Sequence, residues 1–257
     1  MNLQKCLLLG ALVLGGIALS PAAAFAQARC NAVPDHAELK AALTAVVDGT
    51  NAGLSNEMWA TVVNRNGVVC AVVFSGDTRA DQWLGSRVIS AQKANTALAF
   101  SLPGDAGFGG ALSSGNLYGV VQPGGSLFGL QFSNPVDTSV AYGGPSLRLG
   151  RPNDPMVGEK IGGVNVFGGG LALYNGDNLV GGLGVSGDTS CTDHIVAWRL
   201  RDEIDLDAVP GGVGDGGTND NLILADPVVP NTFQHPNCGN GGEVEIITDL
   251  ATDVPIE

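Results

Sequence analysis

Two pairs of short apolar runs, each joined by a tight turn, constrain the fold of this chain most strongly. Residues 59–64 and 68–74 are separated by Arg65-Asn66-Gly67. Because an Asn-Gly pair tolerates the positive φ angles of a tight hairpin turn, these two runs are predicted to pair antiparallel. Residues 171–174 and 179–185 flank an Asn-Gly-Asp-Asn turn and, with the run 164–167, predict a meander. We therefore expect a sheet of roughly five antiparallel strands.

Helical patterns lie before, between and after these strands. Asp35 and Glu38 have the spacing of a capping box, and the apolar periodicity that follows predicts a helix ending near Gly53. Ser86 and Ser190 are predicted to cap a second helix, running to about residue 100, and a final helix. Helices available for both faces of an antiparallel sheet indicate the α+β class, as a three-layer α/β/α sandwich.

Residues 101–163 interrupt this pattern. They are rich in Gly, Pro, Asn and Ser and have weak periodicity, apart from a short predicted helix over 113–121. Long segments without regular elements are usually functional or mobile. We interpret residues 101–163 as a Gly-rich insertion.

The N-terminus resembles an export signal. Lys5 precedes an apolar run over 6–19, and Ala24-Phe25-Ala26 is an A-x-A cleavage sequence. The run is shorter than the ~20 residues of a transmembrane helix, and no later run reaches that length, so no membrane span is predicted. The prediction is a signal peptide over 1–26 and a periplasmic or secreted protein; an uncleaved anchor is the alternative.

Four cysteines follow the predicted signal peptide: Cys30, Cys70, Cys191 and Cys238. An even number in an oxidising compartment predicts two disulfides, and sequence alone leaves three connectivities open. Of these we favour the one that includes Cys30–Cys238, which would tie the two ends of the chain together.

Charge is distributed unevenly. Twelve acidic residues and no Lys or Arg lie from residue 202 onward, so nucleic acid is excluded as a partner because its binding requires basic side chains. We divide the mature chain into a domain over 27–207 and an acidic C-terminal extension over 208–257. Within the extension, residues 210–221 are predicted to form a flexible linker or loop.

Catalytic and metal-binding motifs are weak. Ser90 and Lys93 have the S-x-x-K spacing of penicillin-recognising enzymes, but the companion K-[ST]-G is absent, which favours an ordinary helix surface. Asp215, Asp220 and Asp226 have oxygen ligands suited to Ca²⁺, but without EF-hand spacing a solvated acidic loop is the default interpretation.

His194 is the histidine of greatest interest. It lies four residues before Trp198 on the predicted final helix, a spacing that places a ligand nitrogen beside an aromatic wall. The alternative is a surface histidine at the start of a helix. Covalent attachment of haem is excluded because there is no C-x-x-C-H.

Two blocks of sequence resemble the GlcG/HbpS-type haem-binding (haem-degrading) family, related to the C-terminal domains of PduO proteins. They are SAQKANTA at 90–97 with Phe100, and LVGGLGVSG at 179–187, preceded by GGVNV at 162–166. The resemblance covers roughly residues 37–206. It implies a profilin-like fold, frequent homo-oligomers and, in some members, haem bound at the surface or between subunits.

The leading hypothesis is therefore an exported, non-catalytic protein that binds haem or another tetrapyrrole. The pocket is expected between residues 101–163 and the start of the final helix, with His194 as iron ligand and Trp198, Tyr142 and Phe167 as walls. One alternative is an enzyme that acts on haem or on a small exported metabolite. Another is a structural module whose glycine loops pack in a homo-oligomer or against a partner.

Overall fold

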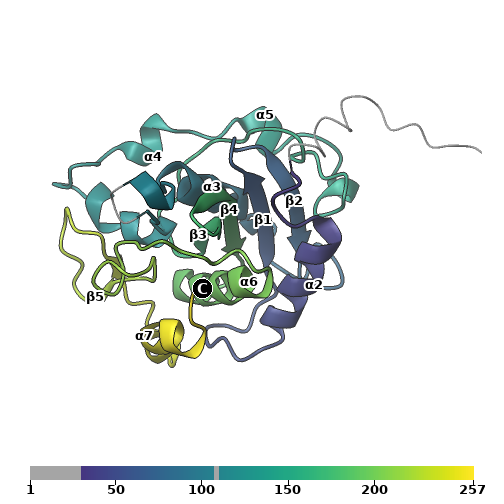
Figure 1. Cartoon of the computed structure of the whole chain (residues 1–257). Coiled ribbons are helices and arrows are strands. Elements are labelled where there is room, and N and C mark those ends of the chain that lie inside the picture. Colours follow the sequence, from purple (N-terminus) through teal and green to yellow (C-terminus); the bar gives the residue numbers. More distant parts are fainter. Residues whose placement is uncertain (1–29, 107–109) are drawn as a thin grey trace, which may run out of the picture.

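The computed structural model describes residues 30–106 and 110–257, so the predicted signal peptide lies outside the described residues. A four-stranded antiparallel sheet forms the centre of the molecule (Figure 1), with strand order β2-β1-β4-β3. The strands are β1 Trp59–Asn64, β2 Val69–Phe74, β3 Gly170–Asn175 and β4 Asn178–Ser186. Both predicted hairpins are present, because β1 pairs with β2 and β3 pairs with β4.

The prediction of a fifth strand is wrong, because residues 164–167 do not join the sheet. The Asn165 amide donates to Thr96 Oγ1 at 2.9 Å, and the Asn165 side chain accepts from the Phe167 amide at 3.1 Å. Gly162 and Gly163, just before this run, have φ angles of 64° and 82°. The backbone here turns and bonds to side chains instead of to a neighbouring strand.

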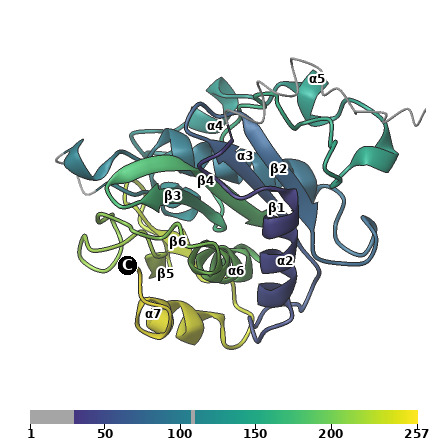
Figure 2. The ribbon, with the colours of Figure 1, turned by 45° about the vertical axis from the view of Figure 1, so that its right-hand side comes forward.

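Helices cover both faces of the sheet (Figures 1 and 2). The long helices are α2 His36–Val47, α3 Ser86–Ala99 and α6 Ser190–Glu203. Ala60 and Val62 of β1 belong to the buried cluster that contains α2 and α6, whereas Trp59 and Val63 belong to the cluster that contains α3. Alternate residues of one strand thus serve opposite faces, as three layers require.

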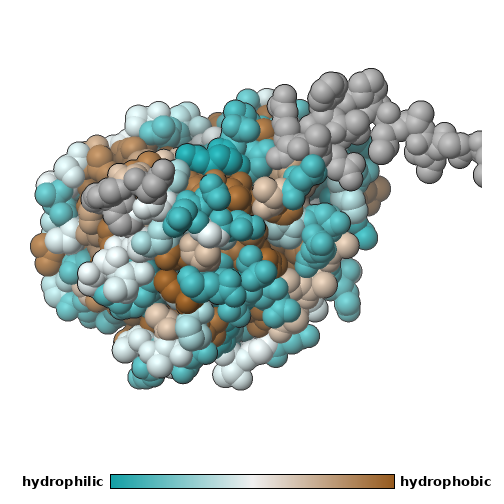
Figure 3. Space-filling model, viewed as in Figure 1, coloured by the Kyte–Doolittle hydropathy of each residue, from teal (hydrophilic) through white to brown (hydrophobic). Residues whose placement is uncertain are grey.

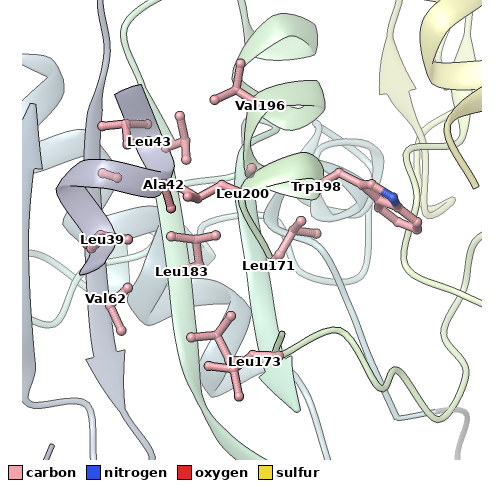
Figure 4. Packing of buried hydrophobic residues seen from close by; sticks show 14 of the residues in the cluster. Leu39, Ala42, Leu43, Val62, Leu171, Leu173, Leu183, Val196, Trp198 and Leu200 are labelled. Atoms are coloured by element: carbon pink, nitrogen blue, oxygen red, sulfur yellow. The ribbon is translucent and has the colours of Figure 1, made fainter. Parts of the chain in front are cut away.

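Figure 4 shows the α2–α6 side of this core, where Leu39 and Leu43 of α2 belong to one buried cluster with Leu183 of β4 and Leu200 of α6. On the other face, α3 approaches β4 closely. A Cβ at Gly184 would lie 1.9 Å from the carbonyl oxygen of Ser90. The glycines of the 179–187 block therefore allow α3 to pack directly on the strand.

The helix ends show which local predictions succeed. The capping box of α2 is confirmed: Asp35 accepts from the Ala37 and Glu38 amides, and the Glu38 carboxylate accepts from the Asp35 amide. Helix α2 ends at Val47, before Gly53. Neither predicted serine cap is correct, because Gly85 caps α3 and Thr189 caps α6.

In its described residues, the 101–163 insertion contains only short elements. These are α4 Leu130–Ser133, α5 Thr138–Ala141 and the 3₁₀ turns Gly104–Ala106, Ser114–Leu117, Gly119–Val121 and Ser146–Arg148. Two of these turns replace the predicted helix over 113–121. A buried ion pair between Arg87 of α3 and Asp154 holds the insertion against the domain, and Arg87 also donates to the Ala141 carbonyl at 2.9 Å.

The C-terminal extension packs against α6 rather than projecting from the domain. It contains β5 Leu224–Ala225, β6 His235–Pro236 and α7 Glu243–Asp253. Both guanidinium ends of Arg201 bond Asp220 at 2.8 Å, and the Trp198 indole donates to the Val254 carbonyl at 2.9 Å. Since Asp220 is fully buried, the linker predicted over 210–221 carries an anchoring side chain.

Two disulfides are present, Cys30–Cys70 and Cys191–Cys238. The favoured Cys30–Cys238 pairing is wrong. Cys30 precedes α2 and lies 5.7 Å from Cys70 of β2, measured between Cα atoms, whereas Cys238 lies 6.0 Å from Cys191 at the start of α6. Each bridge therefore fastens one terminal segment to the sandwich, and the two ends are not joined to each other.

The molecular surface mixes hydrophilic and hydrophobic patches in the view of Figure 3. In the described parts of the chain, no helix has both the length and the apolar character needed to span a bilayer. Several of the exposed large apolar side chains belong to the insertion: Phe128, Phe132, Tyr142 and Leu147.

Candidate functional site

The four residues expected to form a haem pocket lie in different surroundings in the described structure. His194 and Trp198 lie on α6 with 0% and 1% of their surface exposed, and their ring centroids are 6.3 Å apart. Tyr142 follows α5 and is 69% exposed, and Phe167 precedes β3 and is 44% exposed. Of these residues, only Phe167 lines the pocket at the start of α6.

His194 is enclosed by the protein. Burial lowers its pKa to about 3, and positive charge on Arg201 acts in the same direction. The imidazole is therefore neutral, the form that binds a metal, but no part of the side chain reaches the surface. Trp198 contacts the C-terminal extension through its indole N–H. Neither side chain lines any of the cavities described below.

Phe167 lines a cavity of about 280 Å³ that we call the α3–α6 pocket. Its wall is formed by α3, the end of β4, the start of α6 and three connecting segments. The lining residues are Trp83, Ser86, Ile89, Lys93, Phe167, Ser186, Asp188, Ser190 and Asp193. Trp83 is 55% exposed and Phe167 is 44% exposed, so two aromatic rings lie at the rim of the pocket. An apolar rim with a polar interior is typical of small-molecule sites.

A buried ion pair forms part of this pocket. Lys93 Nζ donates to Asp193 Oδ2 at 2.6 Å and to the Val185 carbonyl at 3.0 Å. Asp193 Oδ1 accepts from the amides of Gly187 and Asp188 at 3.0 and 2.9 Å. Burial raises the pKa of Asp193 to about 6 and lowers the pKa of Lys93. The pair joins α3 to α6 and places polar groups at the base of the pocket.

Serine hydroxyls add to this polar base. Ser86 and Ser186 are 3% and 4% exposed and both line the cavity. Their hydroxyl groups can donate or accept hydrogen bonds. Lys93 was considered in the sequence only for its S-x-x-K spacing with Ser90, but the Ser90 hydroxyl bonds Thr61 Oγ1 at 2.8 Å and the Arg87 carbonyl. The chemistry of Lys93 therefore depends on Asp193, which follows it by a hundred residues.

The C-terminal extension supplies a histidine that contacts one of the pocket serines. Ser190 Oγ lies 2.7 Å from His235 Nε2, and His235 Nδ1 lies 2.7 Å from the Pro236 carbonyl. The sequence indicated nothing of this contact, since the two side chains are separated by 45 residues. In the sequence, His235 is only a histidine in a Gly/Asn-rich tail, and a histidine in such a segment is usually exposed to solvent.

Candidate metal ligands gather beside this contact. Among the described residues, Cys191, His235 and Cys238 have ligand atoms within 4.8 Å of one another. Both sulfur atoms belong to the Cys191–Cys238 disulfide, so neither is a thiolate that binds a metal ion. The expected iron ligand, His194, is not a member of this group. The Ca²⁺ candidate Asp220 is already paired with Arg201.

Larger cavities exist elsewhere in the described chain. One of about 740 Å³ lies beside the Cys30–Cys70 disulfide, and one of about 490 Å³ lies along the loop that follows α2. In the second cavity, the Asp188 carboxylate accepts hydrogen bonds from the backbone amides of Leu54 and Asn56. The α3–α6 pocket is smaller but combines exposed aromatic rings, a buried ion pair and a serine–histidine contact, so it is our candidate site.

Comparisons with known proteins agree with the sequence blocks noted above. A family model described as haem degrading protein HbpS-like matches residues 35–199, and no curated protein matches the chain. A solved PduOC–haem complex is 22% identical over 66% of this chain and 91% of its own, with a TM-score of 0.44. The Klebsiella pneumoniae protein ORFY is 20% identical over 76% and 97%, with a TM-score of 0.42. Because the family model spans more than half of the sequence, this chain belongs to the HbpS-like family of haem-degrading proteins.

Proposed function

We propose that this protein is exported and binds haem, or a related tetrapyrrole, at the α3–α6 pocket. The observation that carries the proposal is the pair of exposed rings, Trp83 and Phe167, at a cavity with a polar base in a member of this family. A planar aromatic ligand gains most by stacking on such rings.

The size of the pocket defines how the ligand would be held. At about 280 Å³ it is slightly smaller than ordinary ligand sites, which have volumes of ~300–1,000 Å³. It therefore suits one edge of a macrocycle, leaving the rest exposed or covered by a second subunit. Trp83, Ile89 and Phe167 supply the apolar contacts, and the Lys93–Asp193 pair and nearby serines supply the polar ones. Bound haem would supply redox-active iron.

We propose binding at this pocket without His194 as the iron ligand. Haem would reach this histidine only if the covering chain moved, because the ring has no exposed surface. Titration with haemin, followed by the Soret band, tests the proposal. We expect a micromolar shift that is weakened at least tenfold in a Trp83→Ala, Phe167→Ala double variant and unchanged in His194→Gln.

Phe132→Ala is the matched control, since Phe132 is 84% exposed and outside the pocket. No Soret shift in the unaltered protein would reject haem binding. If the Soret shift is lost in His194→Gln but kept in the double variant, haem binds at His194 on α6, as the sequence predicted, and not at the α3–α6 pocket.

Haem degradation is the second candidate function, favoured by the description of the family. It predicts time-dependent bleaching of the Soret band when haem-loaded protein receives a reductant or peroxide. A stable spectrum under these conditions supports binding without turnover. Homo-oligomer formation through the exposed side chains of the insertion is a separate proposal, and the mass in solution tests it.

A further inference from the structure

Ser190 occupies a position suited to nucleophilic chemistry. It is the first residue of α6, directly after β4 and a three-residue turn, and its partly exposed side chain lines the α3–α6 pocket. The positive end of the helix dipole lies at this point, where it stabilises negative charge on a nearby oxygen. A helix start does not make a site by itself, and the contacts of Ser190 decide its role.

The hydrogen bonds around Ser190 fix where each proton lies. The Gly168 amide donates to Ser190 Oγ at 2.7 Å, so the hydroxyl hydrogen is free to point to His235 Nε2, 2.7 Å away. His235 Nδ1 faces the Pro236 carbonyl at 2.7 Å. A carbonyl oxygen only accepts, so Nδ1 carries the ring proton and Nε2 presents its lone pair to the serine.

His235 is held firmly in this orientation. It is 1% exposed, its amide donates to the Ile223 carbonyl at 2.9 Å, and the ring of Tyr118 packs against it with a centroid distance of 5.8 Å. The Cys191–Cys238 disulfide links the residue after Ser190 to the same tail segment. Burial lowers the pKa of His235 to about 4, so the ring is neutral near neutral pH and Nε2 has a free lone pair.

The histidine comes from outside the family domain. The family model ends at residue 199, whereas His235 lies in the C-terminal extension. The extension thus adds a base to a serine on the wall of a pocket that the family domain provides. This arrangement of serine, histidine and an acceptor on the second ring nitrogen is the one that activates hydroxyl nucleophiles.

We propose that Ser190 is a nucleophile activated by His235, and that the α3–α6 pocket accepts small carboxylic esters with an apolar or aromatic acyl group. Trp83, Ile89 and Phe167 would contact that group. This inference does not depend on haem binding.

The reaction follows the chemistry of serine esterases. Ser190 Oγ bonds to the acyl carbon while its proton passes to His235 Nε2; the alcohol then leaves and takes that proton. Water attacks the acyl-serine, gives one proton to His235 and releases the acid, and His235 returns the proton to Ser190. One ester and one water thus yield one acid and one alcohol.

An alkyl fluorophosphonate tests the nucleophile directly, because the activated serine displaces fluoride and forms a stable phosphonyl ester. We expect the disulfide-oxidised protein to gain one adduct by intact mass, mapped to Ser190 by peptide sequencing. Ser190→Ala should not be labelled. Ser133→Ala, a serine of the insertion outside the pocket, should be labelled like the unaltered protein.

His235→Gln separates a base from a structural contact. Glutamine retains a hydrogen-bond acceptor but not the basicity, so we expect the labelling rate to fall about 100-fold. His36→Gln is the control, because His36 also contacts a backbone carbonyl, that of Gly150, but does not line the α3–α6 pocket. Full labelling of His235→Gln, labelling at another residue, or no adduct on the folded, unaltered protein would each overturn the proposal.

Haemin titration and fluorophosphonate labelling of the unaltered protein together distinguish this proposal from the proposed function. Haem binding without labelling of Ser190 would reject the nucleophile and leave the haem proposal in place. Absence of haem binding in the unaltered protein, with normal labelling of Ser190, would reject the haem proposal and leave the nucleophile in place. Melting curves of each variant establish that it is folded.

Discussion

The domain matched by the family model and the C-terminal extension that covers its last helix are stabilised in different ways. The domain buries two continuous apolar clusters between the helices and the sheet. The extension has two strands of two residues and one helix of 11 residues. A small apolar cluster of Cys191, Ile195, Leu222 and Ile247 packs the extension on α6. Four specific contacts add to it: the Arg201–Asp220 pair, the Cys191–Cys238 disulfide, the Ser190–His235 bond and the Trp198–Val254 bond.

The comparison teaches that an acidic, glycine-rich tail is not necessarily a solvated one. Arg201 is fully buried and needs an anionic partner, and the extension supplies it. Thr189 and Thr192 at the start of α6 likewise donate to Glu243, which is fully buried. The extension therefore satisfies polar groups of α6 that a domain ending near residue 207 would leave exposed.

The largest expected effect is at the buried ion pair between the two regions. Asp220→Ala leaves the Arg201 charge buried without its carboxylate, which costs about 3–5 kcal/mol of unfolding free energy. Urea denaturation followed by circular dichroism measures it. Asp249→Ala, an exposed position on α7, should change stability by less than ~0.5 kcal/mol. Equal effects of the two variants would mean that the extension is not part of the cooperative fold.

A smaller effect is expected at the disulfide. Replacing Cys191 and Cys238 together by alanine opens a loop of 47 residues and should cost about 2–4 kcal/mol. Limited proteolysis should then cut the extension before the domain. Replacing Cys30 and Cys70 by alanine serves as the control, because it releases the segment before α2 instead of the extension. If that control exposes the extension equally, the two regions are not fastened independently.

The last expected effect is acid sensitivity, which involves a histidine from each region. Burial lowers the folded-state pKa of His194 to about 3 and of His235 to about 4. Because the unfolded chain takes these protons near pH 6.5, stability should fall below that pH by about 1.4 kcal/mol per unit for each histidine.

Asp193 opposes this trend, because its pKa is raised to about 6 and the folded state binds its proton more readily than the unfolded chain. It adds stability as the pH falls from about 6 toward 4 and offsets about one histidine. Denaturation at pH 7.5 and 5 measures the net loss. His235→Gln should reduce the pH dependence, and an unchanged slope would contradict the assigned burial of His235.

Local pattern was sufficient for the regular elements. The hairpin around Asn66-Gly67, the capping box at Asp35 and the helices near Ser86 and Ser190 follow from contacts within a few residues. The predicted strand over 164–167 failed because its backbone bonds to Thr96, a partner distant in sequence. The predicted caps Ser86 and Ser190 were wrong by one residue, because the preceding residues, Gly85 and Thr189, are at the N-cap positions.

The candidate site depended on distant contacts throughout. Phe167 was recognised as an aromatic wall, but Trp83, Lys93 and Asp193 were not assigned to one pocket, since α3 and α6 meet only in the folded sheet. His194 was predicted to be the iron ligand because helical spacing places it near Trp198. The same spacing does not tell which face of α6 the domain and the extension bury.

By itself the sequence determined the antiparallel hairpins, the flanking helices, the likeness to the HbpS-like family and an even set of four cysteines. It did so because turn chemistry and apolar periodicity act over a few residues. Tertiary structure alone decided which cysteines pair, that the acidic extension packs on α6, and that His235 meets Ser190 at the α3–α6 pocket. These outcomes depend on close packing between segments far apart in the chain, which no local pattern encodes.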